Sequence, residues 1–450
     1  MAEPAPPSRP AHARRAPVPG HRDIRRLAGP IILSNLSTPL LGAVDTAVMG
    51  HLPDAAYLGA VAVGSVIFSF LYWGFGFLRM GTTGFTAQAH GAGDADERRA
   101  CLGRPLILAA ALGLLLIALQ WPIGRTAFAL MDAGAQVEGL AGTYFAIRIW
   151  SAPFALTNYA VLGWLLGTQR ARHALALQVV LNGINIALDL LFVVGLGYTV
   201  AGVAAASLLA EMAAAALGLG LCAHLLRGLG GRWSRRRLLA RDALVRLFRV
   251  NRDIFIRTLS LIFAFAYFTA RGAQFGETTL AANAVLMQFQ NILSFGLDGF
   301  AHAAETLVGS AVGARDRRAF SAAVRTSTVW AAGLALLFAA VLALAGPALL
   351  ALFTDIPEVR ARAETFLPWM IASPFVSIWA FQLDGVFIGA TRTRAMRNAM
   401  LACLAIYLAG VWTFTPVLGN HGLWLALILF LGARGASLAL AYPALVRSLR

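Results

Sequence analysis

Six acidic side chains lie inside long apolar stretches of this sequence, where ionisable groups are rare. An acid at the centre of a bilayer-spanning helix costs ~2.5–3.5 kcal/mol on insertion scales, so acids kept there usually serve the movement of ions or substrates. The motifs HExxH, GxxxxGK[ST], GxSxG and CxxC are missing, so we expect neither an enzyme nor a bound cofactor. The six acids are Asp45, Asp189, Glu211, Asp298, Glu305 and Asp384.

Four of the polar residues are expected to meet in the first half of the chain. Asp45 follows Arg26 at nearly the same separation as Asp189 follows Arg172, which places the two acids at similar heights. Asn185 is one turn below Asp189, and Ser207 enters from the opposite direction. Two carboxylates together in a low dielectric cannot both ionise cheaply, so one is expected to bind a proton near neutral pH. The same oxygens could instead hold Na⁺, or each acid could pair with an arginine, a backbone donor or interfacial water.

The second half offers candidates for substrate binding or secondary coupling. Asp298 and Glu305 are two helical turns apart and share one helix face, and Asp384 lies at a depth similar to that of Glu305. Asn158 joins them as a candidate from the first half. The alternative is a structural ion pair with an intramembrane arginine. The arginines available are Arg79, Arg148, Arg271 and Arg434.

Composition predicts the elements that must position these groups. The 450 residues are 59% hydrophobic and 13% charged, with a mean hydropathy of +0.70, whereas ordinary soluble domains are about 25% charged. Many apolar runs exceed the ~18 residues that span a bilayer. The prediction is an all-α integral membrane protein of twelve transmembrane helices. They are expected near 27–50, 57–85, 101–122, 139–160, 172–194, 200–226, 251–273, 279–311, 321–346, 364–388, 396–418 and 421–445.

The positive charge predicts a topology and not a nucleic-acid partner. All 37 basic residues are arginines, and 30 of them lie on one set of alternate connecting segments and the two termini. Arginine excess marks the cytoplasmic side of membrane proteins and attracts anionic lipid headgroups. We therefore expect a multi-pass protein of the cell inner membrane with both termini in the cytoplasm.

The two halves of the chain repeat each other at a constant offset. LGAVAV at Leu58 returns as LAANAV at Leu280, and GTQRAR at Gly167 returns as GATRTR at Gly389. Six spans per copy bring the chain back to the same side, so the copies are parallel repeats that enclose a central cleft. The predicted divisions are a disordered cytoplasmic arm, a six-helix bundle, a cytoplasmic linker and a second six-helix bundle. Their bounds are 1–23, 24–226, 227–250 and 251–450.

Prolines in the first span indicate a bend. Pro30 and Pro39 both fall in the span near 27–50. A proline leaves a carbonyl unpaired and kinks a helix, and the membrane tolerates this where protein or water meets the freed group. A functional bend and the general frequency of proline in membrane helices are equally compatible with the sequence.

Long strings resemble the multidrug and toxic compound extrusion (MATE) transporters, in particular the DinF-like branch. They include LAGPIILSNLSTPLLGAVDTAVMGHL, GTQRARHALALQVVLNGINIALDLLFVVGLG and LDGFAHAAETLVGSAVGARDRR. The resemblance implies a two-lobed antiporter that exports organic, often cationic, compounds against an inward flow of protons or Na⁺. It implies that Asp45 carries the coupling ion and that Asn185 and Asp189 match an Asn and Asp four apart.

The resemblance extends to further positions and leaves rival functions to weigh. Ser207 stands where the family often has threonine, which keeps an oxygen but leaves a sodium site in doubt. Asp298 and Glu305 match the LDG string and the acid that follows it, and Asp384 is carried over less firmly.

We expect a monomer with a small-molecule substrate. The rivals are a lipid-linked oligosaccharide flippase of the same superfamily, a membrane-embedded enzyme and a channel.

Overall fold

The computed structural model describes residues 18–50, 54–131 and 134–449, without the side chains of 38–41 and 43. All regular elements in these ranges are helical. The helices are α1 (His21–Gly50), α2 (Ala55–Gly74), α3 (Phe77–Gly91), α4 (Ala95–Ala118), α5 (Gln120–Met131), α6 (Ala135–Arg148), η1 (Ile149–Ser151), α7 (Ala152–Gly167), α8 (Ala171–Asp189), η2 (Leu190–Gly195), α9 (Val200–Gly228), α10 (Arg235–Leu238), α11 (Arg241–Ala273), α12 (Glu277–Gly313), α13 (Arg317–Phe353), α14 (Pro357–Gly389), α15 (Thr393–Leu418) and α16 (Asn420–Arg447).

The predicted fold class is confirmed. Within the described ranges, eleven helical stretches are long and apolar enough to cross a membrane, counting α2 with α3 and α6 with α7 as single crossings. Helix α1 is 30 residues long, which at 1.5 Å per residue is about 45 Å, and it completes the set of twelve. The protein is therefore an all-α integral membrane protein of two six-helix bundles.

Three details differ from the sequence prediction. The span expected at 57–85 is interrupted, because α2 ends at Gly74 and α3 begins at Phe77. A short helix, α5, follows the third span and was not predicted. The end of the segment expected as a linker is helical, since α11 begins at Arg241. The start of α11 is helical because Leu247, Val250 and Ile254 recur on one face and are buried against the protein.

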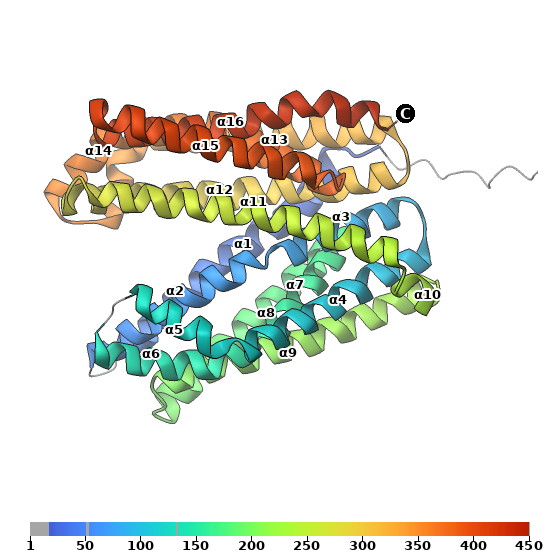
Figure 1. Ribbon diagram of the computed structural model, residues 1–450, viewed down its shortest axis with the longest axis horizontal. Coiled ribbons are helices and arrows are strands. Elements are labelled where there is room, and N and C mark those ends of the chain that lie inside the picture. Colours follow the sequence, from blue (N-terminus) through green and yellow to red (C-terminus); the bar gives the residue numbers. More distant parts are fainter. Residues whose placement is uncertain (1–17, 51–53, 132–133, 450) are drawn as a thin grey trace, which may run out of the picture.

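The repeat extends to the backbone. The turn after α3 has Gly93 at φ +70°, and the turn after α12 has Arg315, its counterpart in the repeat, at φ +54°. Gln169 and Thr391 form a second such pair, at φ +61° and +54°. Left-handed backbone is costly for residues other than glycine, so its recurrence at equivalent positions shows that the two lobes share one fold. The lobes, α1–α9 and α11–α16, lie one above the other in Figure 1.

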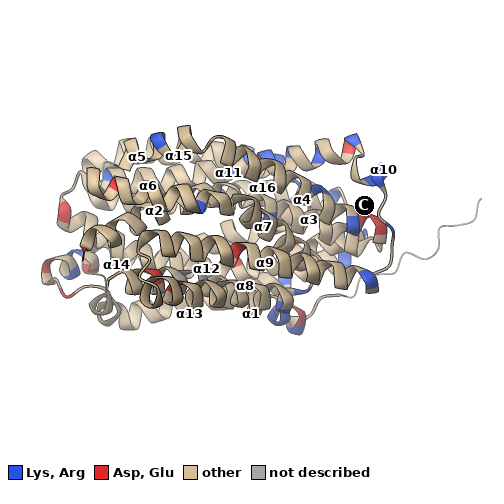
Figure 2. Ribbon diagram, turned by 90° about the horizontal axis from the view of Figure 1, so that it is seen from below, with Lys and Arg blue, Asp and Glu red and all other residues tan. Residues whose placement is uncertain are grey.

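The two lobes meet tightly at one end of the molecule. The turns that carry most arginines gather at this end, with α10 and the C-terminus (Figure 2), and we call it the arginine-rich end. Here α3 packs on α12 so closely that a Cβ on Gly91 would lie 1.8 Å from the Ser310 carbonyl oxygen, and a Cβ on Gly313 would lie 1.9 Å from that of Gln88. Towards the opposite end the ribbons of the two lobes diverge (Figure 1).

Helix α1 contacts both lobes. Near the arginine-rich end, Ile32 packs against Gly299 of α12, and the Asn35 amide donates to the Phe295 carbonyl oxygen (3.2 Å). On its other side, Ser37 accepts a hydrogen bond from Asn182 of α8 (3.0 Å). A displacement of α1 therefore changes contacts in both bundles at once.

Candidate functional site

The carboxyl groups of Asp45 and Asp189 lie against each other inside the first lobe. Asp45 on α1 is 8% exposed and Asp189 at the end of α8 is 0% exposed. Their side chains lie within interaction range of each other, and one oxygen of each has no hydrogen-bond partner among the described residues. Two carboxylates can form a hydrogen bond only if one of them carries a proton, because ionised carboxylates have no donor. A hydrogen bond between Asp45 and Asp189 would therefore require a proton on one of the two carboxyl groups.

Asn185 and Ser207 extend this pair into a network. The Asn185 amide is satisfied on both sides when its nitrogen donates to Asp189 Oδ2 (3.3 Å) and its oxygen accepts from the Ser207 N–H (3.1 Å). Asn185 is one turn before Asp189 on α8, and Ser207 comes from α9. The structure thus brings together all four residues that the sequence placed at one depth: Asp45, Asn185, Asp189 and Ser207.

An arginine that the sequence did not assign to this group completes it. The Arg148 guanidinium donates to Ser207 Oγ (3.1 Å) and to the Tyr144 hydroxyl, and it lies over the Phe68 ring at 5.3 Å. Its charge is within electrostatic range of Asp45 and Asp189. We call Asp45, Asn185, Asp189, Ser207 and Arg148 the first-lobe cluster. The sequence offered no signal for this partner, because α6 is far from α1 and α8 along the chain.

The helix geometry around Asp189 is irregular. The α-helix ends at Asp189 and continues as the π-helix η2 over Leu190–Gly195. Such wider turns occur frequently at functional sites, where they redirect a side chain. Here the change of pitch comes directly after the carboxyl group that contacts Asp45.

Asn158 and Glu211 form a separate contact in the first lobe. The Asn158 amide donates to Glu211 Oε2 (2.5 Å) and to the Glu211 carbonyl oxygen (3.2 Å). The structure therefore places Asn158 on the side of α7 that faces α9, away from the acids of the second lobe with which it was grouped. Arg148 is also within electrostatic range of Glu211, so three acids share one arginine.

In the second lobe Asp384 is held by two arginines. Its Oδ2 accepts from Arg257 and from Arg434 (2.8 Å), and all three side chains are buried. Arg434 was one of the partners that the sequence left open, whereas Arg257 was not among them. Of the other three arginines weighed for these acids, Arg148 lies in the first-lobe cluster. We call Asp384, Arg257 and Arg434 the second-lobe cluster.

Glu305 and Asp298 differ although they share a face of α12. Glu305 is 0% exposed, its Oε2 lies 3.0 Å from His302 Nδ1, and its Oε1 has no hydrogen-bond partner among the described residues. Asp298 is partly exposed.

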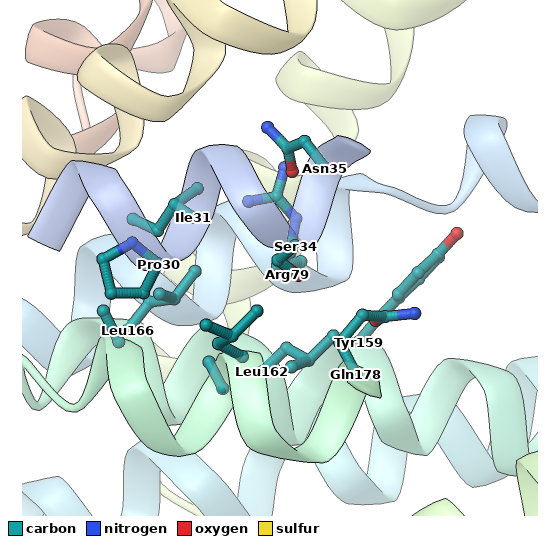
Figure 3. A pocket seen from close by; sticks show the side chains of 12 residues that line it. Pro30, Ile31, Ser34, Asn35, Arg79, Tyr159, Leu162, Leu166 and Gln178 are labelled. Carbon is teal, nitrogen blue, oxygen red and sulfur yellow. The ribbon is translucent and has the colours of Figure 1, made fainter. Parts of the chain in front are cut away.

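Pro30 lines a cavity on the first lobe, at the α1–α8 boundary (Figure 3). Helix α1 runs without interruption through Pro30 and Pro39, so the predicted functional bend stays a prediction. The side chain of Pro39 lies outside the described residues. In the described ranges, no three His, Cys, Asp or Glu side chains converge as a metal site would require.

Comparisons with known proteins agree with this architecture. The family model MatE matches residues 30–191 and 254–413. DNA damage-inducible protein F of Escherichia coli (strain K12) is 43% identical over 415 residues, which cover 92% of this chain and 90% of that protein. The probable multidrug resistance protein NorM of Deinococcus radiodurans is 30% identical over 448 residues, covering 93% and 94%.

Solved structures share the fold at lower sequence identity. One is described as the outward-facing conformation of a multidrug resistance MATE family transporter of the MOP superfamily. It superimposes with a TM-score of 0.85 at 20% identity, covering 95% of this chain and 96% of that one. A MATE structure in the bent conformation gives 0.85 at 21% identity and covers the same shares of the two chains.

The family model and the relatives identify a membrane transporter and not an enzyme, and the two-bundle fold agrees with this class. More particularly, the chain belongs to the MatE family, as the family model and the relatives show.

Proposed function

We propose that this transporter is a proton-coupled antiporter that exports organic compounds, cationic ones among them, by alternating access. In this proposal the arginine-rich end faces the cytoplasm of a cell whose inner membrane holds the protein. Several relatives carry the name multidrug resistance protein, which supports drug-like substrates here.

The observation that carries the proposal is the contact between Asp45 and Asp189. Counting charges supports a proton as the coupling ion. Full ionisation of Asp45, Asp189 and Glu211 beside Arg148 leaves a net charge of −2 in a buried region. Two protons neutralise it, whereas an uncompensated buried charge is strongly unfavourable. Arg148 also opposes the approach of a further cation such as Na⁺ by Coulomb repulsion.

Helix α1 supports the link between proton binding and transport. It carries Asp45 in the first lobe, and it packs against Gly299 and Phe295 of α12 in the second. In the proposed cycle, protons from outside neutralise the first-lobe cluster, α1 moves about its prolines, and substrate leaves. One proton moving down 100 mV supplies ~2.3 kcal/mol, which sustains a concentration gradient of roughly 50-fold.

Transport by purified protein in proteoliposomes tests the proposal. A cationic dye should be exchanged when a pH gradient is imposed and not when a sodium gradient alone is imposed. Asp45→Asn should abolish this exchange, because an amide can neither release nor bind the proton. Asp355→Asn is the matched control, since Asp355 has the same chemistry on a fully exposed loop.

Each result decides a part of the proposal. Exchange by Asp45→Asn at the normal rate would show that Asp45 is not the carrier. Exchange driven by sodium alone would replace the proton with Na⁺. Movement of a lipid-linked sugar without any dye exchange would favour the flippase.

A further inference from the structure

The cavity in Figure 3 has one charged residue in its wall, and that residue is an arginine. Twelve residues of α1, α3, α7 and α8 surround a space of about 150 Å³. Arg79 of α3 supplies the charge, and four neutral polar side chains accompany it. No acid is among the twelve. The polar four are Ser34, Asn35, Tyr159 and Gln178.

The Arg79 guanidinium has no partner among the residues that the structure describes. None of them offers it a hydrogen-bond acceptor, and no described carboxylate oxygen lies within 4.0 Å of it. Two acids on α12, Asp298 and Glu305, interact with it at electrostatic range only, and Glu305 is already bonded to His302. An arginine that is half-buried among membrane helices without a counter-charge is costly. A bound anion would remove that cost.

The remaining seven residues of the cavity wall are apolar. In Figure 3 the side chains of Pro30, Ile31 and Leu166 lie together at one end, and Arg79 lies with Asn35 towards the other. A cavity of about 150 Å³ accommodates a benzene-sized group. A guanidinium at the polar end binds a carboxylate through two parallel hydrogen bonds. The occupant that fits both ends is an aromatic or branched carboxylate, with any larger part outside the mouth.

We infer that this cavity is a binding site for organic anions bearing a carboxylate, with Arg79 as the residue that recognises the charge. The inference rests on the proposed export function and adds organic anions to its substrates. It is coupled to the same helices, because α1 and α8 line the cavity and also carry Asp45 and Asp189. Movement of these two helices on protonation therefore reshapes the cavity.

Binding of a charge series to the purified full chain tests the inference. The ligands are benzoate, neutral benzamide and benzylammonium, which share a ring and differ in charge. Radiolabelled ligand and nanodiscs of zwitterionic lipid keep the assay free of competing anionic headgroups. Benzoate should bind roughly 10- to 100-fold more tightly than benzamide, the range expected for charge-assisted hydrogen bonds. Benzylammonium should bind least.

Variants assign the preference to one residue. Arg79→Gln should make benzoate bind no better than benzamide, and Arg79→Lys should keep part of the preference, since lysine retains charge without the planar fork. Arg125→Gln is the matched control for net charge, because Arg125 is exposed and is not part of the cavity wall. Benzylammonium binding as tightly as benzoate would overturn the inference, as would an unchanged preference in Arg79→Gln. If that variant does not fold, the charge series on the natural chain decides alone.

The two proposals fail separately. Asp45→Asn should keep the benzoate preference even though it loses proton-driven exchange. Loss of exchange with retained binding supports both proposals. If the natural chain binds benzoate, benzamide and benzylammonium equally well but still shows proton-driven exchange, only the proposed anion site is refuted.

Discussion

The glycine contact between the lobes leads to a quantitative prediction about the conformational equilibrium. Gly91 of α3 packs on Ser310, and Gly313 of α12 packs on Gln88, at positions related by the repeat. In Gly91→Ala the new Cβ would start 1.8 Å from a backbone oxygen, whereas real Cβ contacts stay above 3.0 Å. The lobes must therefore separate at the arginine-rich end until this contact is relieved. The Ser310 carbonyl oxygen belongs to the helix backbone, so it cannot rotate out of the clash as the end of a flexible side chain could.

The expected cost is that of overpacking a tight contact, about 1–3 kcal/mol. It acts only on the state in which the arginine-rich end is closed, so that state becomes about 5- to 150-fold less favourable relative to the state open at this end. Alanine otherwise favours a helix over glycine by about 1 kcal/mol. A shift of the equilibrium away from the closed state would therefore be caused by the clash at this contact, because the substitution itself does not weaken the helix. Gly313→Ala should act alike, and the double variant should cost less than the sum, because one separation relieves both clashes.

Distances between spin labels measure the shift. Arg172→Cys and Arg394→Cys place labels on exposed, repeat-related positions of the two lobes, in a chain whose three native cysteines are changed to alanine. Gly91→Ala should add a longer-distance population. Gly333→Ala is the control, since a Cβ there meets nothing within 4 Å. An unchanged distance distribution in Gly91→Ala would refute the argument that this contact holds the lobes together.

Two further predictions concern stability. Asp384→Asn leaves two buried guanidinium groups without their carboxylate partner and should lower the free energy of unfolding by about 3–5 kcal/mol. The loss should appear as a lower unfolding midpoint in detergent. A midpoint equal to that of Asp355→Asn would contradict this. At the turn before α4, burial alone would raise the pKa of Asp94, but hydrogen bonds from the Glu97 N–H and from Arg237 outweigh it and hold the pKa below 3.8. A carboxyl group with a lowered pKa stabilises the fold above its ordinary pKa, and that contribution disappears as the pH falls through the folded value. The unfolding midpoint should therefore exceed that of Asp94→Asn at pH 7. The excess should shrink as the pH falls below the ordinary pKa of a free aspartate, and an excess that stays constant down to full protonation would exclude the proposed charge effect.

The sequence could not predict which arginine pairs with which acid. The sequence left Asp384 with four arginines as possible partners, and the structure pairs it with Arg434 and also with Arg257. Arg148, weighed for the second lobe, lies beside Asp45 and Asp189 instead. Which arginine meets which acid depends on how each helix is rotated and packed, and a depth estimate from helical rise contains neither quantity.

The elements themselves were accessible without coordinates. The bilayer demands apolar runs of about 20 residues, so eleven helical stretches of the described ranges and α1 fall where hydropathy placed them. The repeat was visible as matching strings at a constant offset and reappears in the left-handed turns at Gln169 and Thr391. The exceptions are the break between α2 and α3, the short helix α5, and the start of α11, where many arginines led the sequence analysis to expect a polar linker.

For this protein, the chain by itself determined the helices, the repeat and the acids worth attention, because the membrane penalises each misplaced polar group one segment at a time. Tertiary structure alone decided that Asp45 touches Asp189, that Arg79 faces a cavity without a partner among the described residues, and that Gly91 meets Ser310 across the lobes. These facts depend on contacts between helices far apart in sequence, which local propensity does not encode.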